Sequence, residues 1–168
     1  DLADLTHLLL PGVGAFASAM ARLSETRMIE PIRHFAAKGH PVMGICLGMQ
    51  ILAEMGGEGG HTLGLALIPG KVVPIVPQSG LRLPHVGWNE LIKIKESLLF
   101  DGIPDDALFY YVHSFHVECD DPEVVIGQCE YGVTITAAFQ KDNIYATQFH
   151  PEKSHRFGMA LIKRFLEL

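Results

Sequence analysis

The sequence predicts an α/β fold in which a mixed, mainly parallel sheet is flanked by helices. Two observations carry this prediction: the first third of the chain alternates strand and helix patterns, and most of the remainder consists of short strand-like segments. With 168 residues the chain is long enough to bury a core without disulfides or metals. We therefore expect one domain over residues 1–168.

The first third of the chain has the element order of a parallel sheet covered on both faces. An apolar segment at 5–10 is typical of a buried strand, and it ends at the glycine-rich turn 11–14. Helical periodicity follows over 15–24 and 28–37, and Gly39 is placed to end the second helix. A second apolar strand is expected at 41–43 and a third helix over 47–55.

Beyond Gly56 the strand-like segments become shorter and lie closer together. Turn residues separate them, which favours antiparallel or mixed pairing. The expected strands are 71–76, 90–94, 107–112, 124–129, 133–139 and 144–149. A last helix after Ser154 would place Phe157, Leu161 and Phe165 on the sheet.

Composition narrows the class of protein. The formal net charge is −6 and no basic run occurs, which argues against nucleic acid as a partner. No apolar run reaches the ~18 residues of a membrane span. The three cysteines (46, 119 and 129) fit neither a disulfide framework nor a zinc site, and no secretory leader is evident. We expect a cytoplasmic protein without a membrane partner, in which Cys119 and Cys129 are structural thiols.

The segment Gly44-Ile45-Cys46-Leu47-Gly48 places a thiol where a strand meets a helix. Small neighbours permit a sharp turn, as in the nucleophile elbow that other enzymes build around serine. The start of the following helix would favour the thiolate over the thiol. The alternative is a buried cysteine between packing glycines, a common environment for this residue.

A second group of chemical interest follows the strand expected at 144–149. His150 would emerge at the strand end, and Pro151 stiffens the link from it to Glu152. A carboxylate two residues beyond a histidine can orient the imidazole and stabilise its protonated form, as in nucleophile–His–acid triads. The alternatives are a surface histidine and a solvated acid at a helix start.

The turn Pro11-Gly12-Val13-Gly14 is a third candidate. Glycines at a strand end let backbone N–H groups face a ligand, and with the N–H of Leu47 they could form an oxyanion hole. The alternative is an ordinary strand-to-helix turn.

The blocks Gly44–Gln50 and Phe149–Ser154 resemble the class I (triad) glutamine amidotransferases, which have a flavodoxin-like core. Three more blocks, 11–16, 84–89 and 111–115, resemble the glutaminase subunits of imidazole glycerol phosphate synthases, and the similarity covers the chain from end to end.

The resemblance implies specific roles for the candidate residues. Cys46 would attack the side-chain amide of glutamine, and His150, oriented by Glu152, would protonate the departing ammonia and then activate water. Val13, Gly14 and Leu47 would supply the oxyanion hole. The substrate's amino-acid end would be held by Gly14, Gln50, His113 and Ser114. No cofactor or metal is implied.

The resemblance also implies a partner. Ammonia would pass to a (β/α)8-barrel synthase (cyclase) subunit, joined as a heterodimer, which makes imidazole glycerol phosphate and aminoimidazole carboxamide ribonucleotide. The expected docking face comprises His85, Trp88, Asn89, Tyr110 and Lys153. Core packing is the alternative for Trp88, and solvation is the alternative for Lys153.

Two other functions stay open. The chain could be the glutaminase subunit of another synthase, for anthranilate, guanylate or carbamoyl phosphate, or a non-catalytic binding subunit of the same fold. The family normally begins with a strand-helix-strand unit of roughly 35 residues that has no counterpart here. We expect its absence to leave neighbouring strands unpaired, and the chain to derive from a longer one.

Overall fold

The computed structural model describes residues 2, 4–77 and 80–168. At its centre is a six-stranded sheet. Its strands, in spatial order, are β1 (Leu8–Gly12), β2 (Val42–Cys46), β12 (Ile144–Thr147), β11 (Thr134–Lys141), β10 (Val125–Glu130) and β7 (Ile92–Lys93).

Two smaller sheets complete the strands. One has the order β4 (Thr62–Leu63), β3 (Ala53–Gly56), β5 (Ile68–Pro74) and β9 (Phe115–Cys119), and the other pairs β6 (His85–Glu90) with β8 (Leu108–His113). The α-helices are α1 (Phe16–Glu25), α2 (Ile29–Ala37), α3 (Leu47–Ile51) and α4 (His155–Leu166). Three 3-10 turns occupy Leu98–Phe100, Pro122–Val124 and Pro151–Lys153.

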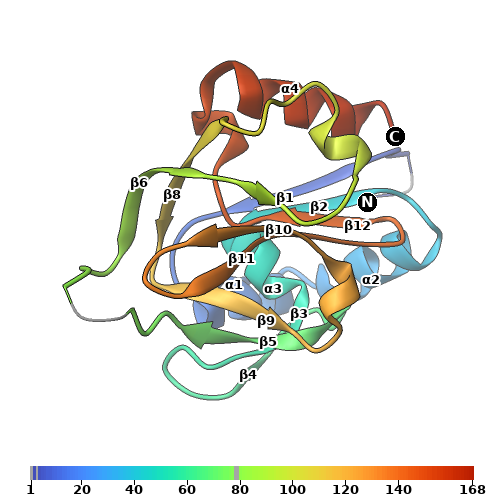
Figure 1. The fold of residues 1–168 in the computed structure, drawn as a ribbon. Coiled ribbons are helices and arrows are strands. Elements are labelled where there is room, and N and C mark those ends of the chain that lie inside the picture. The colour runs from blue at the N-terminus through green and yellow to red at the C-terminus, as the bar shows by residue number, and fades with distance from the viewer. Residues whose placement is uncertain (1, 3, 78–79) are drawn as a thin grey trace.

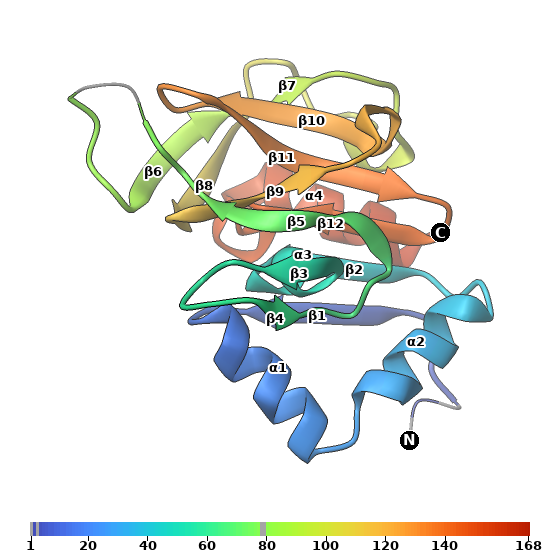
Figure 2. The same ribbon diagram turned by 90° about the horizontal axis from the view of Figure 1, so that it is seen from below.

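The large sheet separates two apolar cores. Helix α4 covers one face, while α1, α2, α3 and the four-stranded sheet lie against the other (Figures 1 and 2). Strand β2 contributes to both cores: Met43 joins the α4 side and Val42 the opposite side. A strand buried on both faces is apolar along its length, which explains the continuous pattern seen in the sequence.

The sheet is mixed, and its parallel part positions the candidate site. Strands β1, β2 and β12 are parallel neighbours, whereas β12, β11, β10 and β7 pair antiparallel. Gly12 pairs with Cys46, and Ile45 pairs with Thr147. The carboxyl ends of three parallel strands therefore meet at one edge, and the α/β fold with a mixed sheet is confirmed. Strand β1 lies at the sheet's edge and pairs with β2.

The third helix is shorter than its periodicity predicts. It ends at Ile51, and strand β3 (Ala53–Gly56) takes up residues 53–55, which were expected to be helical. The carbonyls of Ile51 and Leu52 accept hydrogen bonds from the N–H groups of Leu65 and Leu67, at 2.7 and 2.9 Å. Pairing with a distant segment thus replaces the helical bonds that local periodicity favours.

Other element bounds differ by a few residues from the prediction. The first strand begins at Leu8 and includes Gly12, so it extends into the predicted turn. Strand β6 was not predicted, and β7 covers only part of the strand expected at 90–94. The final helix α4 is confirmed, with Leu161 and Phe165 buried against the sheet. In the described part of the chain, every helix is too short or too polar to cross a membrane.

Candidate active site

Cys46 lies on a strained turn between β2 and α3. Its φ of 54° falls in the left-handed region, where residues with a Cβ are uncommon. The flanking glycines make the turn sterically feasible: a Cβ on Gly44 would lie 2.5 Å from the Gly48 carbonyl oxygen, and one on Gly48 only 1.6 Å from the Leu10 carbonyl oxygen. The nucleophile-elbow geometry predicted from the sequence is therefore present, and it depends on contact between α3 and β1.

A cavity of about 290 Å³ opens beside the thiol. This volume is near the lower end of the range for ligand pockets, as a small polar substrate requires. The structure brings all of the predicted substrate and oxyanion residues together there. The lining residues are Val13, Gly14, Cys46, Leu47, Gln50, Glu58, Pro84, Val112, His113, Ser114 and Phe115.

His150 and Glu152 form a close pair at the same sheet edge. The His150 Nδ1 lies 2.7 Å from the Glu152 Oε1. The other ring nitrogen, Nε2, is buried and has no hydrogen-bond partner within the described residues. That nitrogen is chemically free to accept a proton.

Backbone packing fixes the segment that carries this pair. The His150 N–H donates to the Tyr110 carbonyl at 2.9 Å, and the Ser154 hydroxyl donates to the His150 carbonyl at 2.6 Å. A Cβ on Gly158 would lie 1.8 Å from the Pro151 carbonyl oxygen, so α4 packs directly on the Pro151–Lys153 turn. Ser154 precedes α4 as predicted, but its side chain makes this bond rather than a helix cap.

The environment of the thiol departs from the expectation of a thiolate. Burial raises the pKa of Cys46 to about 11, and the backbone N–H of Leu47, which lowers the pKa, does not offset the burial. The Sγ lies 3.7 Å from the amide nitrogen of Gln148 and 3.9 Å from the Val112 carbonyl. At neutral pH the resting cysteine is therefore a thiol, because the five-residue helix α3 does not compensate for desolvation.

Two polar residues at the site were missed by the sequence analysis. Glu58 lines the cavity, and its Oε2 accepts a hydrogen bond from the Phe16 N–H at 2.8 Å. Gln148 is fully buried beside Cys46. The available signals were an acid within the glycine-rich segment 56–60 and a glutamine two residues before His150.

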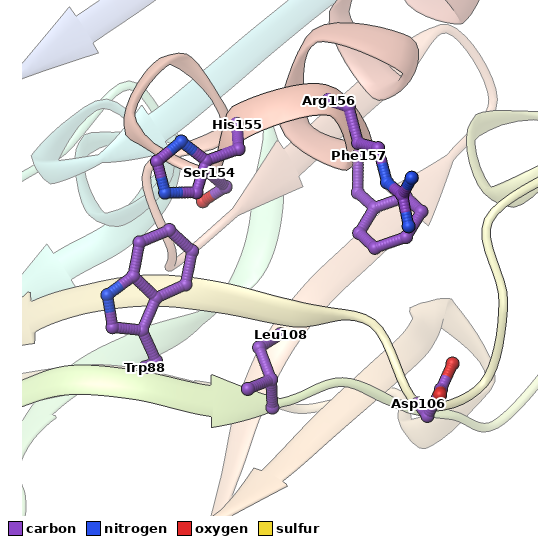
Figure 3. Close-up of a pocket in the computed structure, with 7 residues that line it drawn as sticks. All are labelled: Trp88, Asp106, Leu108, Ser154, His155, Arg156 and Phe157. Carbon is purple, nitrogen blue, oxygen red and sulfur yellow. The ribbon is translucent and has the colours of Figure 1, made fainter.

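Trp88 is on the surface, not in the core. It is 45% exposed, and its indole stacks on the imidazole of His155 at 4.8 Å and 7° (Figure 3). An adjoining apolar hollow of about 460 Å³ also takes in Leu108 and Phe157. We call Trp88, Leu108, His155 and Phe157 the Trp88 surface.

The remaining residues of the expected docking face are not all accessible. Lys153 is exposed, and Tyr110 and Asn89 are half-buried. His85 is 3% exposed, which corrects the expectation that it lies on a docking face. Its ring is enclosed because it stacks on Tyr131 at 4.1 Å and on Tyr111 at 4.8 Å.

His85 and His113 form a buried pair across strands β6 and β8. The His85 Nδ1 and the His113 Nε2 are 3.0 Å apart. Burial lowers the pKa of His85 to about 4 and that of His113 to about 3, so both rings are neutral at pH 7.

This pair predicts a pH-dependent stability. Below pH 6.5 the unfolded chain protonates both histidines, whereas the folded chain does not until about pH 4 for His85 and about pH 3 for His113. The stability present above pH 6.5 is therefore lost as the pH falls from 6.5 towards 4, by up to about 1.4 kcal/mol per pH unit for each histidine. Urea unfolding at pH 7 and pH 5 measures this loss. A smaller loss is expected in His85→Asn, and an equal loss in both proteins would contradict the assignment.

Comparisons with known proteins identify the family. The family model for class-I glutamine amidotransferases matches residues 4–168, and the chain belongs to that family. More particularly, the chain is 47% identical over 165 residues to a protein of Desulfitobacterium hafniense named imidazole glycerol phosphate synthase subunit HisH, covering 98% of this chain and 77% of that protein. A protein of the same name from Helicobacter hepaticus is 48% identical over 170 residues, covering 99% and 78%.

Solved structures show the same fold at lower identity. PurLQS from Thermotoga maritima matches with a TM-score of 0.72 and 19% identity, over 99% of this chain and 81% of that one. A glutamine amidotransferase from Thermotoga maritima matches with a TM-score of 0.67 and 19% identity, over 99% and 65%.

Proposed function

We propose that this chain is a glutaminase subunit that hydrolyses glutamine to glutamate and ammonia and delivers the ammonia to a synthase partner. The observation that carries the proposal is that Cys46, at the end of β2, lines a cavity of substrate size, while the His150–Glu152 pair follows the end of the neighbouring parallel strand β12. The names of the similar proteins favour imidazole glycerol phosphate synthase as the enzyme it serves.

The proposed reaction begins from the protonated thiol. His150 Nε2 takes the proton of Cys46 as the sulfur attacks the glutamine amide carbon, and Glu152 stabilises the resulting imidazolium through Nδ1. The imidazolium then protonates the departing ammonia, which leaves a glutamyl thioester. Water, deprotonated by His150, hydrolyses the thioester and restores the thiol.

The oxyanion of each tetrahedral intermediate needs N–H donors near the sulfur. Leu47 N–H at the start of α3 is one proposed donor, and the 13–14 turn supplies the other. Gly14 has a φ of 108°, a conformation that residues with a Cβ rarely adopt, so this turn can present its backbone to the cavity.

The cavity lining suits the zwitterionic end of glutamine. Glu58 offers a carboxylate for the ammonium group, while Gln50, His113 and Ser114 offer polar side-chain and backbone atoms. We therefore propose that these residues, together with Gly14, bind the amino-acid end of the substrate.

The Trp88 surface is the proposed contact with the (β/α)8-barrel synthase partner. An exposed tryptophan beside an apolar hollow is typical of a protein interface. The other expected contact residues lie on the same elements as the Trp88 surface or next to them. Strand β6 carries both Asn89 and Trp88, and β8 carries both Tyr110 and Leu108. Lys153 ends the turn that precedes His155.

A direct test measures ammonia released from glutamine by the chain alone and with the synthase partner and its nucleotide ligand. We expect release that increases when the partner and nucleotide are added, because the resting thiol is protonated and buried. A complex that forms but releases no ammonia would contradict the proposal. Labelling of Cys46 by a glutamine-like electrophile is expected for a glutaminase and not for a non-catalytic protein of the same fold. Binding to a chorismate-using synthase alone would assign the chain to another pathway.

A further inference from the structure

A continuous chain of hydrogen bonds runs from strand β6, beside Trp88, to the cavity. The Asn89 amide nitrogen lies 3.3 Å from the His85 Nε2, and the His85 Nδ1 lies 3.0 Å from the His113 Nε2. The His113 Nδ1 then lies 2.8 Å from the Phe115 carbonyl oxygen. Three side chains thus link the strand that carries Trp88 to the lining of the cavity.

The direction of these bonds is fixed by their two ends. A carbonyl oxygen only accepts, so the His113 Nδ1 carries a hydrogen, and its Nε2, in the neutral ring, accepts from the His85 Nδ1. The His85 Nε2 must then accept from Asn89. The Asn89 orientation agrees, because its Oδ1 accepts from the Glu90 N–H at 2.8 Å while its nitrogen also donates to the Glu130 carbonyl at 2.9 Å.

The same Phe115 carbonyl continues the chain to the nucleophile. It accepts a second hydrogen bond from the Gln50 Nε2 at 3.0 Å, and that nitrogen also lies 3.2 Å from the Gln148 Oε1. The Gln148 Nε2 reaches the Cys46 Sγ at 3.7 Å. Gln148 and Gln50 are 0% and 6% exposed, so breaking one of these bonds leaves a buried polar group unpaired.

We propose that Asn89, His85 and Gln148 are positioning residues that act through His113 and Gln50. Asn89 and His85 hold the His113 ring, and through it the Phe115 carbonyl, in place at the wall of the substrate cavity. Gln148 directs its side-chain N–H at the Cys46 sulfur. A shift of β6 at the Trp88 surface is thereby transmitted to the cavity and the thiol. This inference rests on the proposed glutaminase function.

Two substitutions at His85 separate hydrogen bonding from ring packing. His85→Phe keeps the stacking on Tyr111 and Tyr131 but removes both hydrogen bonds, and we expect kcat/KM for glutamine in the synthase complex to fall about tenfold or more. His85→Asn places an amide nitrogen near the Nδ1 position and is expected to restore most of the loss. The matched control is His40→Phe, which removes a histidine stacked on Phe35 outside the chain of hydrogen bonds and is expected to leave kcat/KM unchanged.

Nitrogen-15 NMR of the imidazole rings provides a readout independent of activity. Wild-type His85 and His113 are both expected as neutral Nδ1–H tautomers, and Asn89→Asp is expected to move the His85 hydrogen to Nε2, which then donates to the new carboxylate. An Nε2–H tautomer in wild-type His85, or unchanged kcat/KM in His85→Phe, would overturn the inference. If His85→Phe does not fold, Asn89→Asp is expected to lower kcat/KM, and an unchanged value overturns the inference equally. An inactive wild-type complex would refute the glutaminase function, while the tautomers would still test the hydrogen-bond chain.

Discussion

In a Cys46→Ala variant, the rate of synthase-stimulated ammonia release is expected to fall by at least about 10⁴-fold, because the variant lacks the only atom proposed to attack the amide carbon. The remaining triad members cannot substitute for it, because removing one member of a catalytic unit costs about as much activity as removing all of them. The loss is expected in kcat, measured as ammonia formed from glutamine by the complex. Fold and partner binding are expected to persist, because the change removes one sulfur atom from the cavity wall.

The matched control for this variant is Cys119→Ala. Cys119 is a half-buried thiol on β9 and is not among the residues that line the cavity. We expect its ammonia release to equal that of the wild type. Retention of stimulated activity in Cys46→Ala would show that another group is the nucleophile.

Gly48→Ala is expected to destabilise the fold by more than about 3 kcal/mol, the upper part of the range for overpacking. The new Cβ would lie 1.6 Å from the Leu10 carbonyl oxygen, and backbone on β1 cannot move aside as a flexible side chain can. Because native domains have only about 5–15 kcal/mol of stability, a large share of the protein is expected to unfold or to lose the elbow. The urea midpoint and the alkylation rate of the thiol measure the two effects.

Gly57→Ala serves as the comparison for Gly48→Ala. Its Cβ would meet only the Val72 carbonyl oxygen, at 3.3 Å, so a shift of a few tenths of an ångström accommodates it. We expect a small change in the urea midpoint and no change in thiol reactivity. Equal stability of the two variants would mean that α3 does not depend on close contact with β1.

Local patterns located the nucleophile turn but not its electrostatics. Gly44, Cys46 and Gly48 stand out because a tight strand-to-helix turn selects small residues around one reactive side chain. The pKa of the thiol, raised to about 11, depends on how deeply the fold buries it, and burial is set by segments far away in the chain. The helix dipole inferred from local sequence acts in the opposite direction and is the weaker effect here.

The third helix shows the same limit for secondary structure. Apolar periodicity over 47–55 is equally compatible with a helix and with a short helix followed by a buried strand. The segment 64–68 supplies hydrogen bonds to the residues around Leu52, which ends the helix at Ile51. Residues 47–55 alone cannot reveal a hydrogen-bonding partner at 64–68, which lies beyond the glycine-rich segment 56–60.

By itself the sequence determined the α/β class, the elbow at Cys46 and the His150–Glu152 pair, because each follows from short-range spacing within a strand, a turn or a helix start. Only the tertiary structure decided that His85 is buried, that Glu58 reaches the cavity, and that Gln148 lies against the sulfur. These three depend on long-range strand pairing and loop placement, in which residues distant in sequence become neighbours. The reactive groups are therefore encoded locally, whereas the surroundings that tune them arise from the packing of the whole chain.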